Sequence, residues 1–320
     1  MERLSCMGHS DYRGRLLRGL GHGGIPKQRP KQVKGHLTWV PQTFIFPVPT
    51  CTNPNHRSPI TTTPSSLAER FRLDGRVAVV TGASGQLGQA ISRGLADLGA
   101  SLALVDIDPA RAEDLASELG SASHRAFGAD LTNKGKVGEL ASQIGDHFGR
   151  VDILVNNAGI GVFTPSDQRT EAEFTSVIDI NLGGTFHCID AFREQLAKGG
   201  GSIVNIASVY GIVSPDPRVY GDSGRNSSEI YGATKAGVVQ MSKYFAVHLA
   251  PLGIRVNSIS PGGVYANQAK EFVDAYVHRT PMARMAEAQD IQGAVAFLAS
   301  DAAGYVTGHN LVVDGGFSAW

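Results

Sequence analysis

Residues 76–88 read RVAVVTGASGQLG, an apolar run that leads into a glycine-rich turn. The apolar run at 76–81 predicts a strand that is buried on both faces, as in a parallel sheet. After the turn, leucine and isoleucine recur every three or four residues up to Gly99, which predicts a helix over 85–99. A strand, a glycine turn and a helix in succession predict the start of a β-α-β unit.

The same alternation continues along the chain. Further strands are predicted at 101–106, 125–130, 151–159, 201–208, 254–260 and 310–316. Further helices are predicted at 109–119, 134–148, 171–197, 230–250, 267–278 and 287–300. Because such crossovers are right-handed, we predict one Rossmann-type, doubly wound α/β sheet of about seven parallel strands. Ligands of these sheets bind at the carboxyl ends of the strands.

Residues 1–66 differ in composition from the rest of the chain. They hold 8 of the 15 prolines and nine Lys or Arg residues against two acidic ones. We predict a disordered, basic, proline-rich extension over 1–66 and one domain over 67–320. Two interpretations of the extension remain open: a dispensable leader or misplaced start codon, and an organelle transit peptide.

Composition narrows the class of function. The 29 Lys and Arg residues balance the 29 Asp and Glu residues, so no basic footprint for nucleic acid is present. No run of about 18 apolar residues predicts a membrane helix. The three cysteines are scattered and the ten histidines lack metal-ligand spacing. We therefore predict a cytoplasmic protein with a small-molecule substrate, no metal, and no nucleic-acid or membrane partner.

The glycine turn is a candidate phosphate site. Gly82, Gly85 and Gly88 have the spacing G-x-x-G-x-x-G between a strand and a helix. Glycines allow a tight turn and a close approach of a pyrophosphate, and the helix start offers free N–H groups. A plain strand-to-helix turn is the alternative interpretation of this pattern taken by itself.

Asp106 at the end of the second predicted strand strengthens the nucleotide interpretation. A carboxylate there accepts hydrogen bonds from a ribose 2′-OH and repels a 2′-phosphate, which favours NAD over NADP. Arg111 moderates this preference, since it could reach a phosphate. The alternative places Asp106 as a cap of the helix that begins at Pro109, a role that Asp108 fits better.

Four polar residues are candidates for the chemistry. Tyr231 and Lys235 are four residues apart on a predicted helix, so they share one face. A nearby ammonium lowers a phenol pKa below about 10, and such a phenol can exchange a proton with an alcohol or ketone. Ser208 ends a predicted strand and Asn181 lies in the helix 171–197. The alternatives are a surface pair, a plain strand end and a polar helix residue satisfied by backbone.

Taken in order along the chain, these residues resemble the short-chain dehydrogenase/reductase family. The matching residues are Thr81, Gly82, Gly85, Gly88, Asp130, Leu131, Asn156, Asn157, Ala158, Gly159, Asn181, Ser208, Tyr231, Lys235, Pro261, Gly262, Asp314, Gly315 and Gly316. The resemblance implies that Tyr231 is the general acid/base, that Lys235 lowers its pKa and that Ser208 orients the substrate oxygen. It further implies that Asn181 holds a water beside Lys235.

The resemblance also implies a cofactor site and an assembly. The cofactor residues are expected to be Gly82, Ser84, Gly85, Gln86, Leu87, Gly88, Asp106, Asp130, Leu131, Asn157, Ala158, Gly159, Tyr231, Lys235, Pro261, Gly262 and Val264. Asp130 is expected to bond the adenine amino group. A homo-oligomer, tetramer or dimer, is expected through the helices at 171–197 and 230–250.

Two departures from the family pattern stand out. The glycine spacing is that of the extended branch, but the N-N-A-G run and the short stretch after Tyr231 favour the short, single-domain branch. The segment before Tyr231 is longer than usual, and its insert at 211–230 contains Arg218, Tyr220, Asp222, Arg225 and Asn226. This insert favours a polar substrate such as a sugar, sugar acid or polyol, and a solvated loop is the equal alternative.

The segment 263–285 occupies the place of the family's mobile lid. Val264, Tyr265 and Phe272 are candidate pocket walls, with core packing as the alternative. We therefore predict an NAD-dependent oxidoreductase that interconverts a secondary alcohol and a ketone. A 3-oxoacyl or steroid carbonyl reductase, and a catalytically idle dinucleotide-binding protein, are the alternatives.

Overall fold

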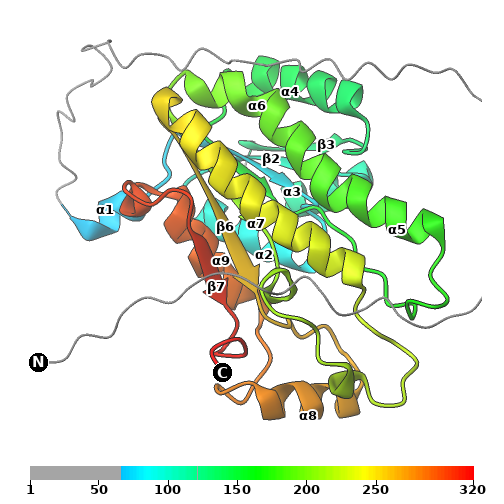
Figure 1. The fold of residues 1–320 in the computed structure, drawn as a ribbon. Coiled ribbons are helices and arrows are strands. Elements are labelled where there is room, and N and C mark those ends of the chain that lie inside the picture. The colour runs from blue at the N-terminus through cyan, green and yellow to red at the C-terminus, as the bar shows by residue number, and fades with distance from the viewer. Residues whose placement is uncertain (1–65, 121) are drawn as a thin grey trace, which may run out of the picture. The chain divides into compact units, whose positions relative to one another are not determined.

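Seven parallel strands form one sheet in the order β3–β2–β1–β4–β5–β6–β7 (Figure 1). The structure is a computed structural model that describes residues 66–120 and 122–320. The strands are β1 (Val77–Thr81), β2 (Ser101–Asp106), β3 (His124–Gly128), β4 (Ile153–Asn156), β5 (Gly201–Ile206), β6 (Ile254–Pro261) and β7 (Asn310–Val313). The predicted doubly wound α/β sheet is confirmed. The extension predicted over 1–66 lies outside the described residues except at Ser66.

The strands are apolar because both faces of the sheet are covered. Side chains alternate between the two faces of a strand, and in β1 Ala78 and Val80 join one apolar cluster while Val79 joins another. All five residues of β1 are buried. The continuous apolar run in the sequence is thus the expected pattern of a central parallel strand.

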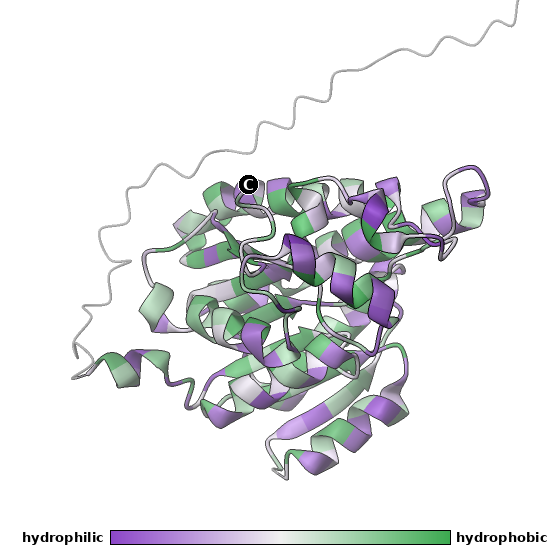
Figure 2. Cartoon of the chain, turned by 90° about the horizontal axis from the view of Figure 1, so that it is seen from below, coloured by the Kyte–Doolittle hydropathy of each residue, from purple (hydrophilic) through white to green (hydrophobic). Residues whose placement is uncertain are grey.

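Helices form a layer on each face of the sheet. One layer contains α2 (Gln86–Asp97), α3 (Pro109–Glu118) and α9 (Ala288–Ala299). The other contains α4 (Lys134–Phe148), α5 (Glu171–Ile178), α6 (Thr185–Ala197) and α7 (Glu229–Leu249). Figure 2 shows hydrophobic residues along the central strands and mixed positions on the helices around them. Within the described ranges, no helix combines the length and apolar character needed to cross a membrane.

The helix predicted over 171–197 is interrupted. A π-helical segment, Asp179–Gly184, separates α5 from α6 and contains Asn181. A π turn inserts one extra residue into a helix, and such insertions often mark functional sites. Hydrophobic periodicity missed it because the apolar residues on both sides remain at helical spacing.

Four strands, β3, β4, β5 and β7, end earlier than predicted. β3 ends at Gly128 and β5 at Ile206, so Asp130 and Ser208 each follow their strand by two residues. Ser208 instead caps a 3₁₀ helix, and its side chain accepts a hydrogen bond from the N–H of Tyr210 at 3.1 Å. The polar side chains therefore sit on the turns that follow the strands.

A short helix precedes β1 that the sequence analysis did not predict. In α1 (Leu67–Phe71), Ser66 and Glu69 form a reciprocal capping box. The S-x-x-E spacing at 66–69 was the available signal. Arg70 donates a hydrogen bond to the carbonyl of Asp301 at 2.9 Å, which attaches α1 to the rest of the domain.

Three segments far apart in the chain meet beyond the carboxyl ends of the strands. We call them the cap: residues 209–228, 263–285 and 314–320. The cap contains α8 (Lys270–Arg279) and a 3₁₀ helix, Pro217–Tyr220, in the lower part of Figure 1. Tyr276 and Phe317 are buried in its apolar cluster, with their rings stacked at 4.7 Å. The cap has a hydrophobic centre of its own.

Candidate active site

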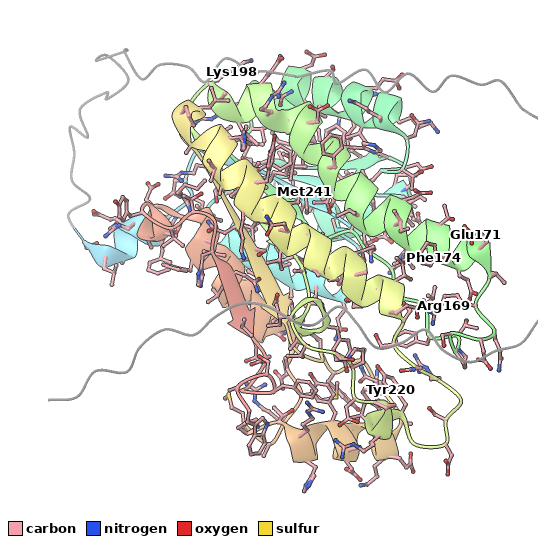
Figure 3. The ribbon with its side chains drawn as sticks, viewed as in Figure 1. Arg169, Glu171, Phe174, Lys198, Tyr220 and Met241 are labelled. Carbon is pink, nitrogen blue, oxygen red and sulfur yellow. The ribbon has the colours of Figure 1, made fainter. Side chains whose placement is uncertain are left out.

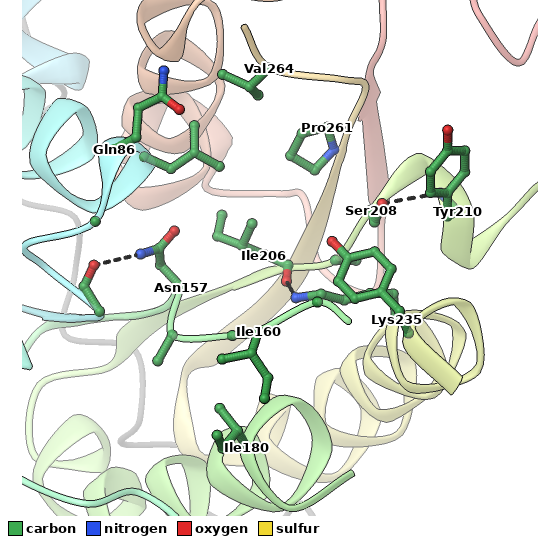
Figure 4. Close-up of a pocket in the computed structure, with 18 of the residues that line it drawn as sticks. Gln86, Asn157, Ile160, Ile180, Ile206, Ser208, Tyr210, Lys235, Pro261 and Val264 are labelled. Atoms are coloured by element: carbon green, nitrogen blue, oxygen red, sulfur yellow. Dashed lines mark hydrogen bonds between the residues drawn. The ribbon is translucent and has the colours of Figure 1, made fainter. Parts of the chain in front are cut away.

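A cleft of about 640 Å³ opens at the carboxyl ends of the strands. It is lined by the turns after β1, β2, β3, β4, β5 and β6, by α7 and by the cap. The order of the strands reverses between β1 and β4, which is where open parallel sheets bind their ligands. Figure 4 shows residues from the turns after β1, β4, β5 and β6 facing one another across the cleft.

The glycine turn after β1 is bound to the turn after β4. Gly82 has a φ of 60°, and a Cβ there would lie 2.9 Å from Cα of Ala158. Thr81 Oγ1 accepts the N–H groups of Asn157 and Ala158 at 3.0 and 3.1 Å. Asn157 Nδ2 donates to the carbonyls of Thr81 and Gly82 at 3.0 Å each. Glycine is thus needed both for its positive φ and for this close approach.

The start of α2 offers hydrogen-bond donors to the cleft. Gly85 is the N-cap, and no side chain caps the helix there. Gln86 and Leu87 in the first turn line the cleft. An uncapped helix start of this kind binds phosphate through free N–H groups and the positive end of the helix dipole. The turn therefore fits the pyrophosphate of a dinucleotide.

Asp106 faces the glycine turn. Its Oδ2 accepts hydrogen bonds from the backbone N–H and the hydroxyl of Ser84, at 3.0 and 2.5 Å. The cap of α3 is Asp108, whose side chain accepts from the N–H groups of residues 110 and 111, so the alternative role for Asp106 is wrong. Arg111 Nη2 donates to the carbonyl of Ser84 at 3.1 Å, and both Asp106 and Arg111 line the cleft.

Asp130 lies in the turn after β3. Its Oδ1 accepts hydrogen bonds from the N–H and the hydroxyl of Thr132 at 3.0 and 2.7 Å. These bonds, the one from the hydroxyl foremost, hold the pKa of the Asp130 carboxyl below its usual value. Asp130 and Leu131 line the cleft as a polar and an apolar neighbour, a pairing that suits an adenine ring.

Ser208, Tyr231 and Lys235 line the cleft together, and Figure 4 shows Ser208 and Lys235 on the same side of it. Lys235 Nζ donates to the carbonyl of Ile206 at 2.8 Å and lies 5.7 Å from the centre of the Tyr231 ring. The hydroxyl of Ser208 lies close enough to the Tyr231 phenol to affect its pKa through hydrogen bonding. The one-turn spacing along α7 thus places both side chains beside the end of β5.

Burial is the main cause of the pKa shifts of Tyr231 and Lys235. It raises the pKa of Tyr231 above its usual value, while the hydrogen bond with Ser208 lowers it. The expectation of a lowered Tyr231 pKa is therefore wrong for the chain taken by itself. Burial also lowers the pKa of Lys235 to about 8. Lys235 is still mostly protonated at neutral pH, since this pKa lies above 7.

Asn181 lies behind the wall of the cleft. Its Oδ1 accepts the N–H of Ile160 at 2.8 Å, and its Nδ2 donates to the carbonyl of Ile160 at 2.9 Å and to Thr234 Oγ1 at 3.3 Å. The residue is fully buried and does not line the cleft. The carboxamide bonds the backbone of Ile160 and the hydroxyl of Thr234, and it connects the turn after β4 to α7.

Of the predicted cofactor residues, most line the cleft and one does not. Those that line the cleft are Gly82, Ser84, Gly85, Gln86, Leu87, Asp106, Asp130, Leu131, Asn157, Ala158, Gly159, Tyr231, Lys235, Pro261, Gly262 and Val264. Gly88 does not line it, because it faces the carbonyl of Gly82 within the turn. Its role is to let α2 pack closely on that turn.

The insert at 211–230 places different side chains in the cleft from those that the sequence suggested. Tyr220 lines the cleft, and so does Ser227, which the sequence analysis missed. Arg218, Asp222 and Arg225 are exposed and do not line it, so the expectation of charged insert residues beside the reacting centre is wrong. A polar stretch in a sequence does not show which side chains turn inward.

The cap supplies further walls that the sequence did not reveal. Phe272 lines the cleft as expected, but Tyr265 is 46% exposed and does not. Tyr210 and Tyr276 line it and were missed. The available signal was weak: Tyr276 follows Phe272 by one helical turn, a spacing equally typical of core packing.

Comparisons with known proteins agree with this geometry. A family model described as enoyl-(acyl carrier protein) reductase matches residues 82–318. The D-threitol dehydrogenase of Mycolicibacterium smegmatis is 39% identical over 78% of this chain and 95% of its own. A short-chain dehydrogenase from Leptospira borgpetersenii with bound NAD+ is 36% identical, with a TM-score of 0.70 over 80% of this chain and 97% of its own.

A third relative binds the phosphorylated cofactor. The structure of a gluconate 5-dehydrogenase from Burkholderia cenocepacia in complex with NADP and tartrate is 31% identical to this chain. Its TM-score is 0.73 over 80% of this chain and 100% of its own. The similar proteins thus differ in cofactor and in the charge of what they bind.

Proposed function

The chain belongs to the short-chain dehydrogenase/reductase family of NAD(P)-dependent oxidoreductases, and we propose that it interconverts a secondary hydroxyl and a ketone on a sugar-like substrate. Polyols and hydroxy acids are the substrates that we propose. The observation that carries the proposal is that one cleft contains both the glycine turn and the Ser208–Tyr231–Lys235 group. A nucleotide site alone would not need that second group.

The residues of the chain divide the chemistry among them. NAD(P) supplies the acceptor or donor of hydride when it is bound. In oxidation, Oη of Tyr231 accepts the proton of the substrate hydroxyl, and in reduction it returns that proton. Ser208 orients the substrate oxygen, and the Lys235 ammonium favours the phenolate. We assign Asn181 as a positioning residue, because it ties Ile160 to α7.

We propose NAD as the preferred cofactor. The Asp106 carboxylate lines the cleft at the end of β2, where it can accept bonds from a ribose and repel a 2′-phosphate. Arg111 lies beside it and opposes that repulsion. The preference for NAD over NADP is therefore expected to be moderate rather than strict.

A hydrophobic ketone is the second candidate substrate. Phe272, Tyr276 and Met285 line the cleft, which favours the binding of an acyl chain or a steroid. A 3-oxoacyl or steroid carbonyl reductase would use the same Tyr231 chemistry in the direction of reduction.

We further propose a homo-oligomer, a dimer or tetramer, located in the cytoplasm. Apolar side chains are exposed along α5, α6 and α7: Phe174 (labelled in Figure 3), Phe186, Tyr244 and Val247. Exposed apolar residues gathered on neighbouring helices are typical of a protein–protein contact. Light scattering of the purified protein tests this assembly.

A substrate screen tests the proposed function. The purified protein is mixed with NAD+ and polyols, sugars or hydroxy acids, and NADH formation is followed by absorbance. In parallel it is mixed with NADPH or NADH and acyl or steroid ketones. We expect NADH formation with at least one polyol or hydroxy acid. Activity confined to the ketones would instead establish the second candidate.

A further inference from the structure

The ionised side chains of the cleft are unevenly distributed. Among the described residues that line it, they are Asp106, Arg111, Asp130 and Lys235. The first three surround the nucleotide end: Asp106 ends β2, Arg111 lies in the first turn of α3, and Asp130 lies in the turn after β3. Lys235 directs its ammonium to the carbonyl of Ile206. The walls that the cap adds beyond Tyr231 are therefore uncharged.

Phenol groups take the place of charges on the cap side. Tyr210 and Tyr220 both line the cleft, and their phenol groups are close enough for Tyr220 to raise the pKa of Tyr210, which burial raises most. The hydroxyl of Tyr276 accepts the N–H of Gly263 at 2.5 Å. A phenol hydroxyl both donates and accepts, as an alcohol does, and the ring offers an apolar face to C–H groups.

Tyr220 is held in place by two other parts of the cap. It ends the 3₁₀ helix Pro217–Tyr220, is only 8% exposed, and packs against Phe272 with ring centres 5.4 Å apart. Asp216, just before that helix, pairs with Arg279 of α8 at 2.6 Å. Figure 3 shows Tyr220 beside α8, beyond the sheet. The insert thus places the phenol of Tyr220 in the cleft. The contacts with Phe272 and Arg279 hold this part of the insert in position.

The cations near this wall already have partners and do not line the cleft. Arg279 lies over the Phe317 ring at 4.8 Å in addition to its pairing with Asp216. Arg218 pairs with the same carboxylate, with its side chain 85% exposed. Arg225 lies over the ring of Phe163, an exposed residue of the cleft lining, at 4.3 Å, which puts this cation at the rim and not in the lining. A carboxylate or phosphate that entered the cap side would lose its water without meeting a cation in the lining there.

We propose that the cap selects a neutral polyhydroxyl substrate over an anionic one, with Tyr220 recognising a hydroxyl remote from the reacting carbon. This inference rests on the proposed function and narrows its substrate class from sugars, polyols and hydroxy acids to the uncharged ones. The physical reason is that burying an unpaired anion costs far more than burying a hydroxyl that finds a phenol partner.

A matched substrate series tests the selectivity. Rates with saturating NAD+ are measured for polyols of four to six carbons and for the aldonates of the same length. We expect kcat/KM to be at least about 100-fold higher for the best polyol than for its aldonate, because the anion loses hydration without a partner. An aldonate that is used as well as its polyol overturns the inference, and Arg225→Gln then tests whether the rim cation recognises it.

A binding measurement distinguishes a failure of the proposed function from a failure of the proposed selectivity for neutral substrates. If neither series is oxidised, the proposed function fails, but the selectivity can still be measured. Binding of each polyol and aldonate to the protein saturated with NADH is then followed by calorimetry. Tighter binding of the polyol supports the inference, and equal or tighter binding of the aldonate overturns it.

The role of Tyr220 has its own test. Tyr220→Phe should raise the KM of a pentitol about tenfold and change kcat less than twofold, because one hydrogen bond to the substrate is lost. The KM of butane-2,3-diol, which lacks remote hydroxyls, should not change. Tyr305→Phe, at a fully exposed tyrosine, is the matched control. An unchanged pentitol KM, or an equal rise for the diol, overturns the role of Tyr220.

Discussion

The two ends of the cleft are built in different ways. The nucleotide end uses short turns that are joined by hydrogen bonds between side chains and backbone, as where Asn157 Nδ2 donates to the carbonyl of Gly82. The cap end uses side chains from three distant segments, gathered around Tyr276 and Phe317. The difference teaches that the cofactor site follows from local sequence, whereas the substrate site depends on long-range packing. The catalytic group lies where the two ends meet.

Removing the phenol of Tyr231 should separate chemistry from cofactor binding. We expect Tyr231→Phe to lower kcat about 1000-fold, because the proton of the substrate loses its acceptor. The affinity for NADH, measured by calorimetry, should stay within twofold, since the nucleotide end is intact. Tyr305→Phe, at a fully exposed tyrosine, serves as the control. Turnover that survives in Tyr231→Phe would contradict the assignment.

The buried charge of Lys235 should appear in stability against pH. Burial lowers its pKa to about 8 in the folded chain, from 10.5 in the unfolded one, so the unfolded chain binds more protons between these values. The free energy of unfolding should therefore rise with pH across this window, by at most about 3 kcal/mol from this group.

Urea unfolding at about pH 8 and about pH 10 measures this effect, with Lys235→Met as the comparison. The free energy of unfolding of the variant should lack the rise with pH that the native chain shows. Equal pH dependence in the two proteins would mean that Lys235 is not buried as a cation at the junction of the two ends.

Asp106 tests whether the nucleotide end selects its cofactor by charge. We expect Asp106→Asn to raise the ratio of kcat/KM for NADP+ over NAD+ at least about tenfold, because a repulsive charge beside the 2′-position is removed. Arg111→Gln should change the ratio in the opposite direction. A native enzyme that clearly prefers NADP+ would contradict the proposal that Asp106 repels a 2′-phosphate. Substrate KM should not change in either variant, which distinguishes this end from the cap.

The ion pair of the cap should have the smallest effect. Arg279→Gln separates α8 from Asp216, and we expect the substrate KM to rise about fivefold while the KM of NAD+ is unchanged. Arg218→Gln removes the exposed partner of the same carboxylate and should change the KM less than twofold, as solvated pairs contribute little. Equal effects of both variants would show that the cap does not depend on α8.

Much of the fold was predictable because its signals are local. β2 and α4 begin and end at the predicted residues, since apolar runs and helical periodicity report directly on burial. Ser208 and Asp130 were placed on strands instead of the turns that follow, because a sequence pattern does not show where ladder hydrogen bonds stop. The π segment around Asn181 was missed because one inserted residue leaves the surrounding pattern unchanged.

The sequence by itself determined the strand–turn–helix units, the glycine turn and the order of the candidate catalytic residues, because each depends on neighbours a few positions away. Only the tertiary structure decided which side chains face the substrate. Tyr220 lines the cleft and Arg218, two residues earlier, points to solvent. That choice is made by the packing of Tyr220 against Phe272 and by the ion pair of Asp216 with Arg279, and both partners lie more than 50 residues further along the chain.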